Sequence, residues 1–161
     1  MKLVDLLQAE SILSPAFSAV GDLVLLADAC RGGIVDTASF PDLTSVESFC
    51  NHIPILDLAD NAATSSREPF YNKDHADFLY ACEIANAIAE SWAAKLRNDY
   101  PSRSFAVYST TCDCPVVRFH SIRPSEPHWM ASVDHIDGYP KGLKIVLHGT
   151  SDSTTPNKSN G

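Results

Sequence analysis

The sequence predicts an α+β domain in which N-terminal helices and one long amphipathic helix, at about residues 74–98, pack on a small antiparallel β-sheet. Apolar residues recur at helical spacing up to about residue 100 and alternate with period two after it. A chain of 161 residues with 45% hydrophobic residues is long and apolar enough to bury a core. We assign residues 1–148 to a single domain and residues 149–161 to a disordered tail, because the tail lacks residues that could anchor a core.

The first part of the chain is expected to form three helices. A short helix is expected near residues 3–7. A second helix is expected to begin at Ser14-Pro15, where serine is a good N-cap and proline suits the first helical position, and to end at Gly32-Gly33. Its apolar residues are Phe17, Val20, Leu23, Val24, Ala27 and Cys30. A third, brief helix is predicted where Thr44 and Glu47 fit a capping box, before Pro54 ends it.

The strongest helical pattern lies at about residues 74–98. Its apolar stripe consists of Phe78, Cys82, Ala85, Ala89, Trp92 and Leu96. Polar residues occupy the other side, and the frequent alanines favour helix and allow close packing. We expect this helix to cover one face of the sheet.

Three strands are predicted after this helix, because β-branched and aromatic residues replace the helical pattern. They cover residues 104–110, 116–122 and 143–148, and the first two are close enough to form a hairpin. Residues 123–142, which contain three prolines and two glycines, are expected to be a long irregular excursion.

One face of this sheet is a candidate binding surface. Val117 and Phe119 are expected to face the helices, which leaves a polar, cationic face on the other side. Its expected members are Tyr108, Arg118, His120, Lys144 and His148. Such a face could receive an acidic peptide, a carboxylate or a phosphate through charge-assisted hydrogen bonds. The ordinary alternative is a solvated sheet face without a ligand.

The net charge of −8 argues against a nucleic-acid partner, because such proteins bind phosphates through an excess of Lys and Arg. Residues 1–100 carry 6 basic and 15 acidic side chains, whereas residues 101–148 are close to neutral and hold four of the six histidines. No apolar run reaches the roughly 20 residues that span a bilayer. We therefore expect no membrane association, and we expect any polar chemistry in the second half of the chain.

Five cysteines, an odd number, favour free thiols in a reducing compartment. The N-terminal residues do not have the pattern of a secretory signal, so we expect a cytoplasmic protein. Cys30 and Cys82 fall within apolar helical patterns, where a thiol usually behaves as a small hydrophobic group.

A metal site is the main alternative to a simple binding surface. Cys112 and Cys114, joined by His120 and His128, would supply ligands suited to zinc or copper(I). The Cys-x-Cys spacing is less typical of structural zinc than two to four intervening residues, and two thiols in a hairpin loop explain it equally. We expect no cofactor otherwise.

The segment Arg123–Met130 combines two prolines with an aromatic residue, Trp129. Stiff segments that end in a large ring are typical anchors of protein interfaces. The alternative is that Trp129 folds back over the sheet and completes the core.

These observations predict a non-catalytic cytoplasmic binding or regulatory domain that engages a protein partner. No catalytic motif is recognisable, which favours a binding protein without excluding an enzyme. The residues expected to bind are Arg118, His120, Arg123, His128 and Trp129. The alternative is a small metal-binding protein or metal-dependent enzyme that uses Cys112, Cys114, His120 and His128. A homo-oligomer, or a subunit that makes contacts through the alanine-rich helix, remains a further alternative.

Overall fold

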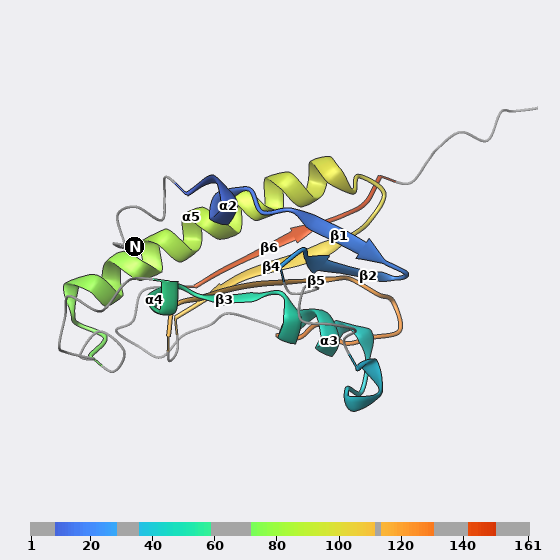
Figure 1. Ribbon diagram of the computed structural model, residues 1–161, viewed down its shortest axis with the longest axis horizontal. Coiled ribbons are helices and arrows are strands. Elements are labelled where there is room, and N and C mark those ends of the chain that lie inside the picture. Colours follow the sequence, from blue (N-terminus) through green and yellow to red (C-terminus); the bar gives the residue numbers. More distant parts are fainter. Residues whose placement is uncertain (1–8, 29–35, 59–71, 112–113, 131–141, 151–161) are drawn as a thin grey trace, which may run out of the picture.

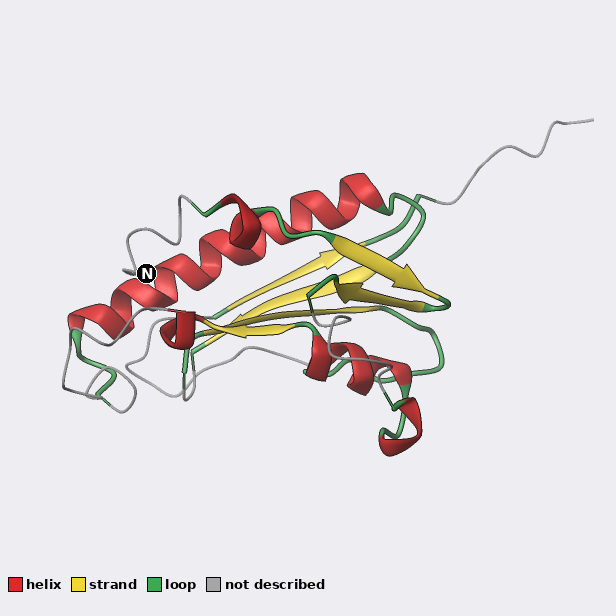
Figure 2. Ribbon diagram, in the orientation of Figure 1, coloured by secondary structure: helices red, strands yellow, loops and turns green. Residues whose placement is uncertain are grey.

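The computed structural model describes residues 9–28, 36–58, 72–111, 114–130 and 142–150. Its elements are α2 (Glu10–Leu13), β1 (Phe17–Val20), β2 (Leu23–Leu26), η2 (Thr37–Ser39), α3 (Leu43–Cys50), β3 (His52–Pro54), α4 (Ile55–Leu58), α5 (Ala76–Asp99), β4 (Phe105–Thr110), β5 (Val116–Ser121) and β6 (Leu143–Leu147). Helices and antiparallel strands form separate layers in Figure 2, which confirms the predicted α+β class.

The centre of the fold is a four-stranded antiparallel sheet with the strand order β3-β5-β4-β6. β4 and β5 form the predicted hairpin, in which Phe105 lies opposite Ser121. β6 pairs with the other edge of β4, so that Phe105 also lies opposite Leu147. All three strands expected in this part of the chain are therefore confirmed.

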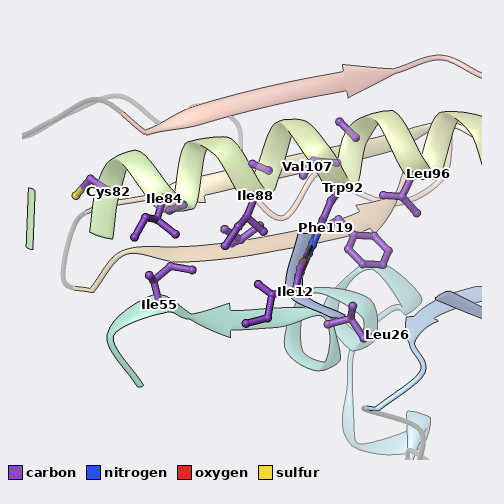
Figure 3. Close-up of a cluster of buried hydrophobic side chains, with 14 of the residues drawn as sticks. Ile12, Leu26, Ile55, Cys82, Ile84, Ile88, Trp92, Leu96, Val107 and Phe119 are labelled. Atoms are coloured by element: carbon purple, nitrogen blue, oxygen red, sulfur yellow. Dashed lines mark hydrogen bonds between the residues drawn. The ribbon is translucent and has the colours of Figure 1, made fainter. Parts of the chain in front are cut away.

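α5 is the long helix predicted at about residues 74–98, and it lies along one side of the sheet (Figure 1). Its buried residues are Phe78, Ala81, Cys82, Ile84, Ala85, Ile88, Ala89, Trp92, Ala93 and Leu96. Figure 3 shows how this face of the helix meets the sheet and the N-terminal segment in one core. No helix in the described ranges is long and apolar enough to cross a membrane.

The helix predicted from Ser14 to Gly33 is wrong. β1 and β2 form an antiparallel hairpin there, with Val20 opposite Leu23 across a two-residue turn. Gly21, the first residue of that turn, has a φ of 59°. Two-residue hairpin turns require such a positive φ, and glycine adopts it without steric cost, so Gly21-Asp22 is the turn signal that the helical interpretation overlooks.

Gly21→Ala distinguishes a hairpin from a helix at this position, because the change in the free energy of unfolding has the opposite sign in the two. In the hairpin we expect the free energy of unfolding to fall by about 1–2 kcal/mol, because alanine is strained at this φ. No atom lies within 4 Å of an added Cβ at this position, so conformation alone sets the cost. In a helix the same change would stabilise the protein by about 0.5–1 kcal/mol. Urea denaturation measures the difference, and a stabilised variant would contradict the hairpin.

α3 confirms the brief helix predicted around Val46, but its N-cap is Asp42 rather than Thr44. The Asp42 carboxylate accepts a hydrogen bond from the Ser45 amide at 2.6 Å. Hydrogen bonds from the Ser45 side chain and then from the Ser45 amide hold the pKa of Asp42 below its ordinary value. Glu47 is therefore not part of a capping box, and its side chain turns toward the sheet.

Side chains of α3 attach the β1–β2 hairpin to the rest of the molecule. Glu47 Oε1 accepts the Val24 amide at 2.7 Å, and Asn51 Oδ1 accepts the Leu26 amide at 2.8 Å. Asn51 Nδ2 also donates to the Val24 carbonyl at 2.8 Å, and the Asn51 carbonyl accepts the Phe119 amide of β5 at 3.3 Å. The backbone edge of β2 that faces away from β1 is thus paired with side chains instead of a strand.

β3 is a short edge strand that the sequence analysis does not predict. It follows α3 directly, pairs His52 with Arg118 and ends at Pro54, which suits an edge position because proline has no amide hydrogen to donate. The predictions at residues 3–7, and all but the first two residues of the tail, lie outside the described residues. Residues 123–130 contain no helix or strand, as expected. The domain boundary at residue 148 stays a prediction.

Candidate binding site

The face of the sheet that points away from α5, which we call the outer face, carries a row of polar side chains. Tyr108 on β4 lies opposite Arg118 on β5 and opposite Lys144 on β6. α3 packs on this side (Figure 1), where Arg118 Nη1 donates to the Ser48 carbonyl at 3.0 Å. Tyr108 and His120 are fully buried, so this face is covered and is not the open platform that the strand pattern suggests.

The covering element is the segment of residues 122–130 that follows β5, which we call the return segment. Its Trp129 ring stands edge-on to the Tyr108 ring, with centroids 5.8 Å apart. The guanidinium carbon of Arg118 lies 3.8 Å from the centroid of the Trp129 ring, a close cation–π contact. Because 37% of Trp129 remains exposed, the residue both covers the sheet and presents an aromatic surface.

His120 anchors the return segment through Nε2 of its ring, while Nδ1 bonds the end of β5. Nδ1 lies 2.9 Å from the Ser121 carbonyl, which only accepts hydrogen bonds, so Nδ1 carries the hydrogen of a neutral ring. Nε2 then accepts the backbone amide of Trp129 at 3.3 Å. The Tyr108 hydroxyl lies 3.0 Å from the same Nε2 and 3.3 Å from the Met130 carbonyl. His120 therefore holds the backbone of Trp129 against the outer face of the sheet.

The buried groups of this site are held in their neutral forms. Burial lowers the pKa of His120 below its ordinary value, because the charged ring would lose its hydration. Burial also raises the pKa of Tyr108 to about 12. Both groups are engaged in hydrogen bonds.

Arg118 stacks on the Trp129 ring, and Lys144 and His128 lie beside its neighbours Met130 and His120. Lys144 Nζ donates to the Met130 carbonyl at 3.2 Å. His128 is exposed, and its ring centroid lies 5.6 Å from that of His120. Desolvation and the charge of Lys144 lower the pKa of His128. Arg118 makes no ion pair with any described carboxylate. We call this set the Trp129 cluster, and its members are Tyr108, Arg118, His120, His128, Trp129 and Lys144.

No protein-family model matches this chain, and no curated protein or solved structure is significantly similar to it. What the protein does is therefore inferred from its own side chains. The Trp129 cluster joins an exposed aromatic ring, a guanidinium that pairs with no described carboxylate and a buried hydrogen-bonded support.

The structure brings together four of the five residues expected to bind and separates the fifth. Arg123 lies outside the cluster, because its guanidinium pairs with both carboxylate oxygens of Glu47 at 3.1 Å. It also donates to the Asp22 carbonyl of the β1–β2 turn at 2.9 Å. Arg123 is therefore a structural residue that ties the return segment to α3 and the hairpin.

α3 has a role in this region that its sequence pattern did not lead us to expect. Glu47 is fully buried, whereas Phe49 on the opposite side is 61% exposed, so the polar side of this helix faces inward. Its inward polar residues are Thr44, Glu47, Ser48 and Asn51. Their spacing of three or four residues is a signal of one continuous helix face, but the capping-box interpretation of Glu47 concealed it.

The four-ligand metal set is not assembled by the described residues. Cys112 lies outside them, and Cys114 precedes β5 whereas His120 is near its end. Six residues of extended chain span roughly 20 Å, which is too far for a shared ion. The described residues hold no group of three or more histidine, cysteine or acidic side chains placed to bind a metal. His120 and His128 alone are adjacent. His148, expected on the same face, follows β6 and is exposed.

The neutral state of His120 predicts that acid destabilises the fold. Its folded pKa lies below the ordinary value of 6.5, so the unfolded chain binds a proton that the folded protein does not. The stability that neutral His120 contributes to the fold is fully present above about pH 6.5 and is lost as the pH falls toward the pKa of His120 in the folded protein. We expect the free energy of unfolding to fall below pH 6.5 by up to about 1.4 kcal/mol per pH unit.

Urea denaturation between pH 7.5 and 5.5 measures this slope, in a range where most carboxylates stay ionised. His120→Gln removes the titrating ring and should flatten the curve. Equal slopes in the wild type and His120→Gln would show that another group is responsible.

Proposed function

We propose that this protein is a non-catalytic binding module that engages a protein partner through the Trp129 cluster. The observation that carries the proposal is the Trp129 ring, which is 37% exposed while it stacks on Arg118 at 3.8 Å. Tryptophan and arginine are the residues most enriched at the energetic centres of protein interfaces. We place the module in the cytoplasm, where its odd number of cysteines would remain reduced.

The rigidity of the cluster supports recognition. His120 holds the backbone of Trp129, Tyr108 supports its ring, and Arg118 fixes its face. Because the supporting side chains Tyr108, Arg118 and His120 are already held in place, binding a partner would cost little additional conformational entropy at these three positions.

The state of the buried groups supports a non-catalytic role. A general base needs a pKa near the working pH and access to a substrate proton. His120 is buried with both nitrogens occupied, and the pKa of Tyr108 is raised to about 12. The cluster therefore has the properties of a contact surface.

The test compares two exposed apolar residues on opposite sides of the molecule. Trp129→Ala and Leu79→Ala remove side chains of similar exposure, 37% and 40%, from the return segment and from α5. We expect a partner captured by the wild-type protein to bind Leu79→Ala normally. Affinity for Trp129→Ala should fall at least about 30-fold, as for an energetic centre worth roughly 2 kcal/mol or more.

Arg118→Ala provides a second variant on the same surface and should weaken binding as well. Circular dichroism and denaturation confirm that each variant is folded before calorimetric titration. If every captured partner binds both folded variants as tightly as wild type, the surface is assigned incorrectly. If Leu79→Ala is the weaker binder, α5 is the contact surface instead.

A further inference from the structure

Three buried polar atoms lack a hydrogen-bond partner in the described part of the chain, and all three lie where α3 meets β5. They are Thr44 Oγ1, Ser48 Oγ and Arg118 Nε. Thr44 and Ser48 are one helical turn apart on the inward side of α3, and Arg118 Nη1 already binds the Ser48 carbonyl. Most buried polar atoms in native proteins are paired, so three unpaired atoms at one contact indicate a role for them.

The charge at this contact is also uncompensated. Burial lowers the pKa of Arg118, yet no described carboxylate pairs with its guanidinium. Arg123, the other inward guanidinium of this region, has both amino groups on Glu47. A buried cation is costly unless an anion or strong hydrogen bonds compensate it, and among the described residues Arg118 contacts only the Ser48 carbonyl and the Trp129 ring in this way.

The free donors have the chemistry that a carboxylate needs. Nη1 of Arg118 is used, so the Nε–Nη2 edge is the unpaired edge of the guanidinium. A guanidinium edge binds the two oxygens of a carboxylate through parallel hydrogen bonds. The hydroxyls of Thr44 and Ser48 can donate to the remaining lone pairs. A carboxylate would supply one negative charge to the Arg118 guanidinium, which pairs with none of the described carboxylates.

We infer that Arg118, Thr44 and Ser48 form a recognition site for a carboxylate of the partner, with Trp129 as its cover. This inference rests on the proposed function and names the chemistry of the bound segment: an acidic side chain or a free C-terminus. Because Arg118 Nε is enclosed, the carboxylate enters as the stacked Trp129 ring moves aside. Binding therefore changes the environment of Trp129 and of the Arg118 Nε–H group together.

Nitrogen–proton NMR of the full chain observes both groups directly. The probes are the blocked peptide acetyl-Ala-Glu-Ala-amide and the free acid acetyl-Ala-Ala-Ala, which separate a side-chain source from a terminal one. Acetyl-Ala-Gln-Ala-amide and inorganic phosphate, at matched ionic strength, are the controls. We expect saturable shifts of Arg118 Nε–H and Trp129 Nε1–H with at least one carboxylate peptide and neither control. Equal binding of the glutamine peptide or of phosphate overturns the inference, as does the absence of saturation.

Variants separate recognition from a structural role. Thr44→Val and Ser48→Ala remove unpaired hydroxyls, so each should leave the protein at least as stable while it weakens peptide binding several-fold. Arg118→Lys keeps the charge but loses the bidentate edge, and affinity should fall roughly tenfold. Ser91→Ala removes a hydroxyl that is paired with the Leu13 carbonyl at 2.6 Å, and should lower stability without changing binding.

Lower stability with unchanged peptide affinity in Thr44→Val and Ser48→Ala would overturn the inference. Failure of the carboxylate site can be told apart from failure of the proposed function. If no carboxylate binds but a captured protein still depends on Trp129, the binding surface stands and the carboxylate site does not.

Discussion

Replacing Glu47 with alanine is expected to lower the free energy of unfolding by about 3–5 kcal/mol, as for other buried ion pairs that lose one partner. The Glu47 side chain is fully buried and accepts hydrogen bonds from three separate parts of the chain. Oε1 accepts the Val24 amide at 2.7 Å and the Ser121 hydroxyl at 3.0 Å. Oε2 accepts the Ser121 amide at 2.5 Å, and both oxygens pair with Arg123.

Alanine would leave a buried guanidinium and two backbone amides without their acceptor, and each unpaired buried group costs about 1–3 kcal/mol or more. Urea denaturation followed by circular dichroism measures the loss. Glu47→Gln keeps the shape but removes the charge, so its effect should be intermediate. Glu90→Ala, on the exposed side of α5, is the control and should change stability by less than about 0.5 kcal/mol. A loss at Glu47 no larger than at Glu90 would contradict the role of Glu47 as the junction of hairpin, helix and sheet.

Trp92→Ala is expected to have an effect of similar size, a loss of about 3–5 kcal/mol. Trp92 is fully buried between the sheet and the N-terminal segment. Its ring stands edge-on to Phe17 and Phe119, with centroid distances of 6.2 and 5.9 Å. Its Nε1 donates to the Ile12 carbonyl at 2.7 Å (Figure 3), so truncation opens a cavity and leaves a buried carbonyl unpaired.

Two further substitutions show which property of Trp92 accounts for the loss of stability. Trp92→Phe keeps an aromatic ring but loses the hydrogen bond and part of the volume, so its cost should lie below that of alanine. Trp129→Ala removes the same kind of side chain at a position that is 37% exposed, and should cost much less stability. Chemical denaturation monitored by circular dichroism compares the three. Similar losses at Trp92 and Trp129 would mean that the core does not depend on the α5 tryptophan as described.

The elements that were predicted correctly are those whose sequence pattern has a single geometric solution. α5 presents an apolar stripe over about five turns, and only a helix places those residues on one side. β4 and β5 alternate between faces, with Val117 and Phe119 toward α5 and Arg118 and His120 away from it. Local periodicity was sufficient in both cases.

β2 shows where periodicity fails. Leu23 to Leu26 are all buried, because Val24 and Leu26 join the α5 core while Leu23 and Leu25 pack against Val46 of α3. A strand that is covered on both faces does not alternate, so its apolar run cannot be told from a helix by pattern alone. The Gly21-Asp22 turn was the one local signal that separates the two.

The sequence alone determined the fold class, the long helix and the β4–β5 hairpin. It also determined which residues of β5 share a face, and so placed Arg118 and His120 together. The tertiary structure decided what covers that face and which charges are compensated. Glu47 and Arg123 form an ion pair although they are 76 residues apart in the chain. Trp129 reaches Arg118 only because the return segment folds back over the sheet. Hydrogen bonds and ion pairs of this kind depend on side-chain distances across the fold, whereas sequence periodicity reports only which face of an element is buried.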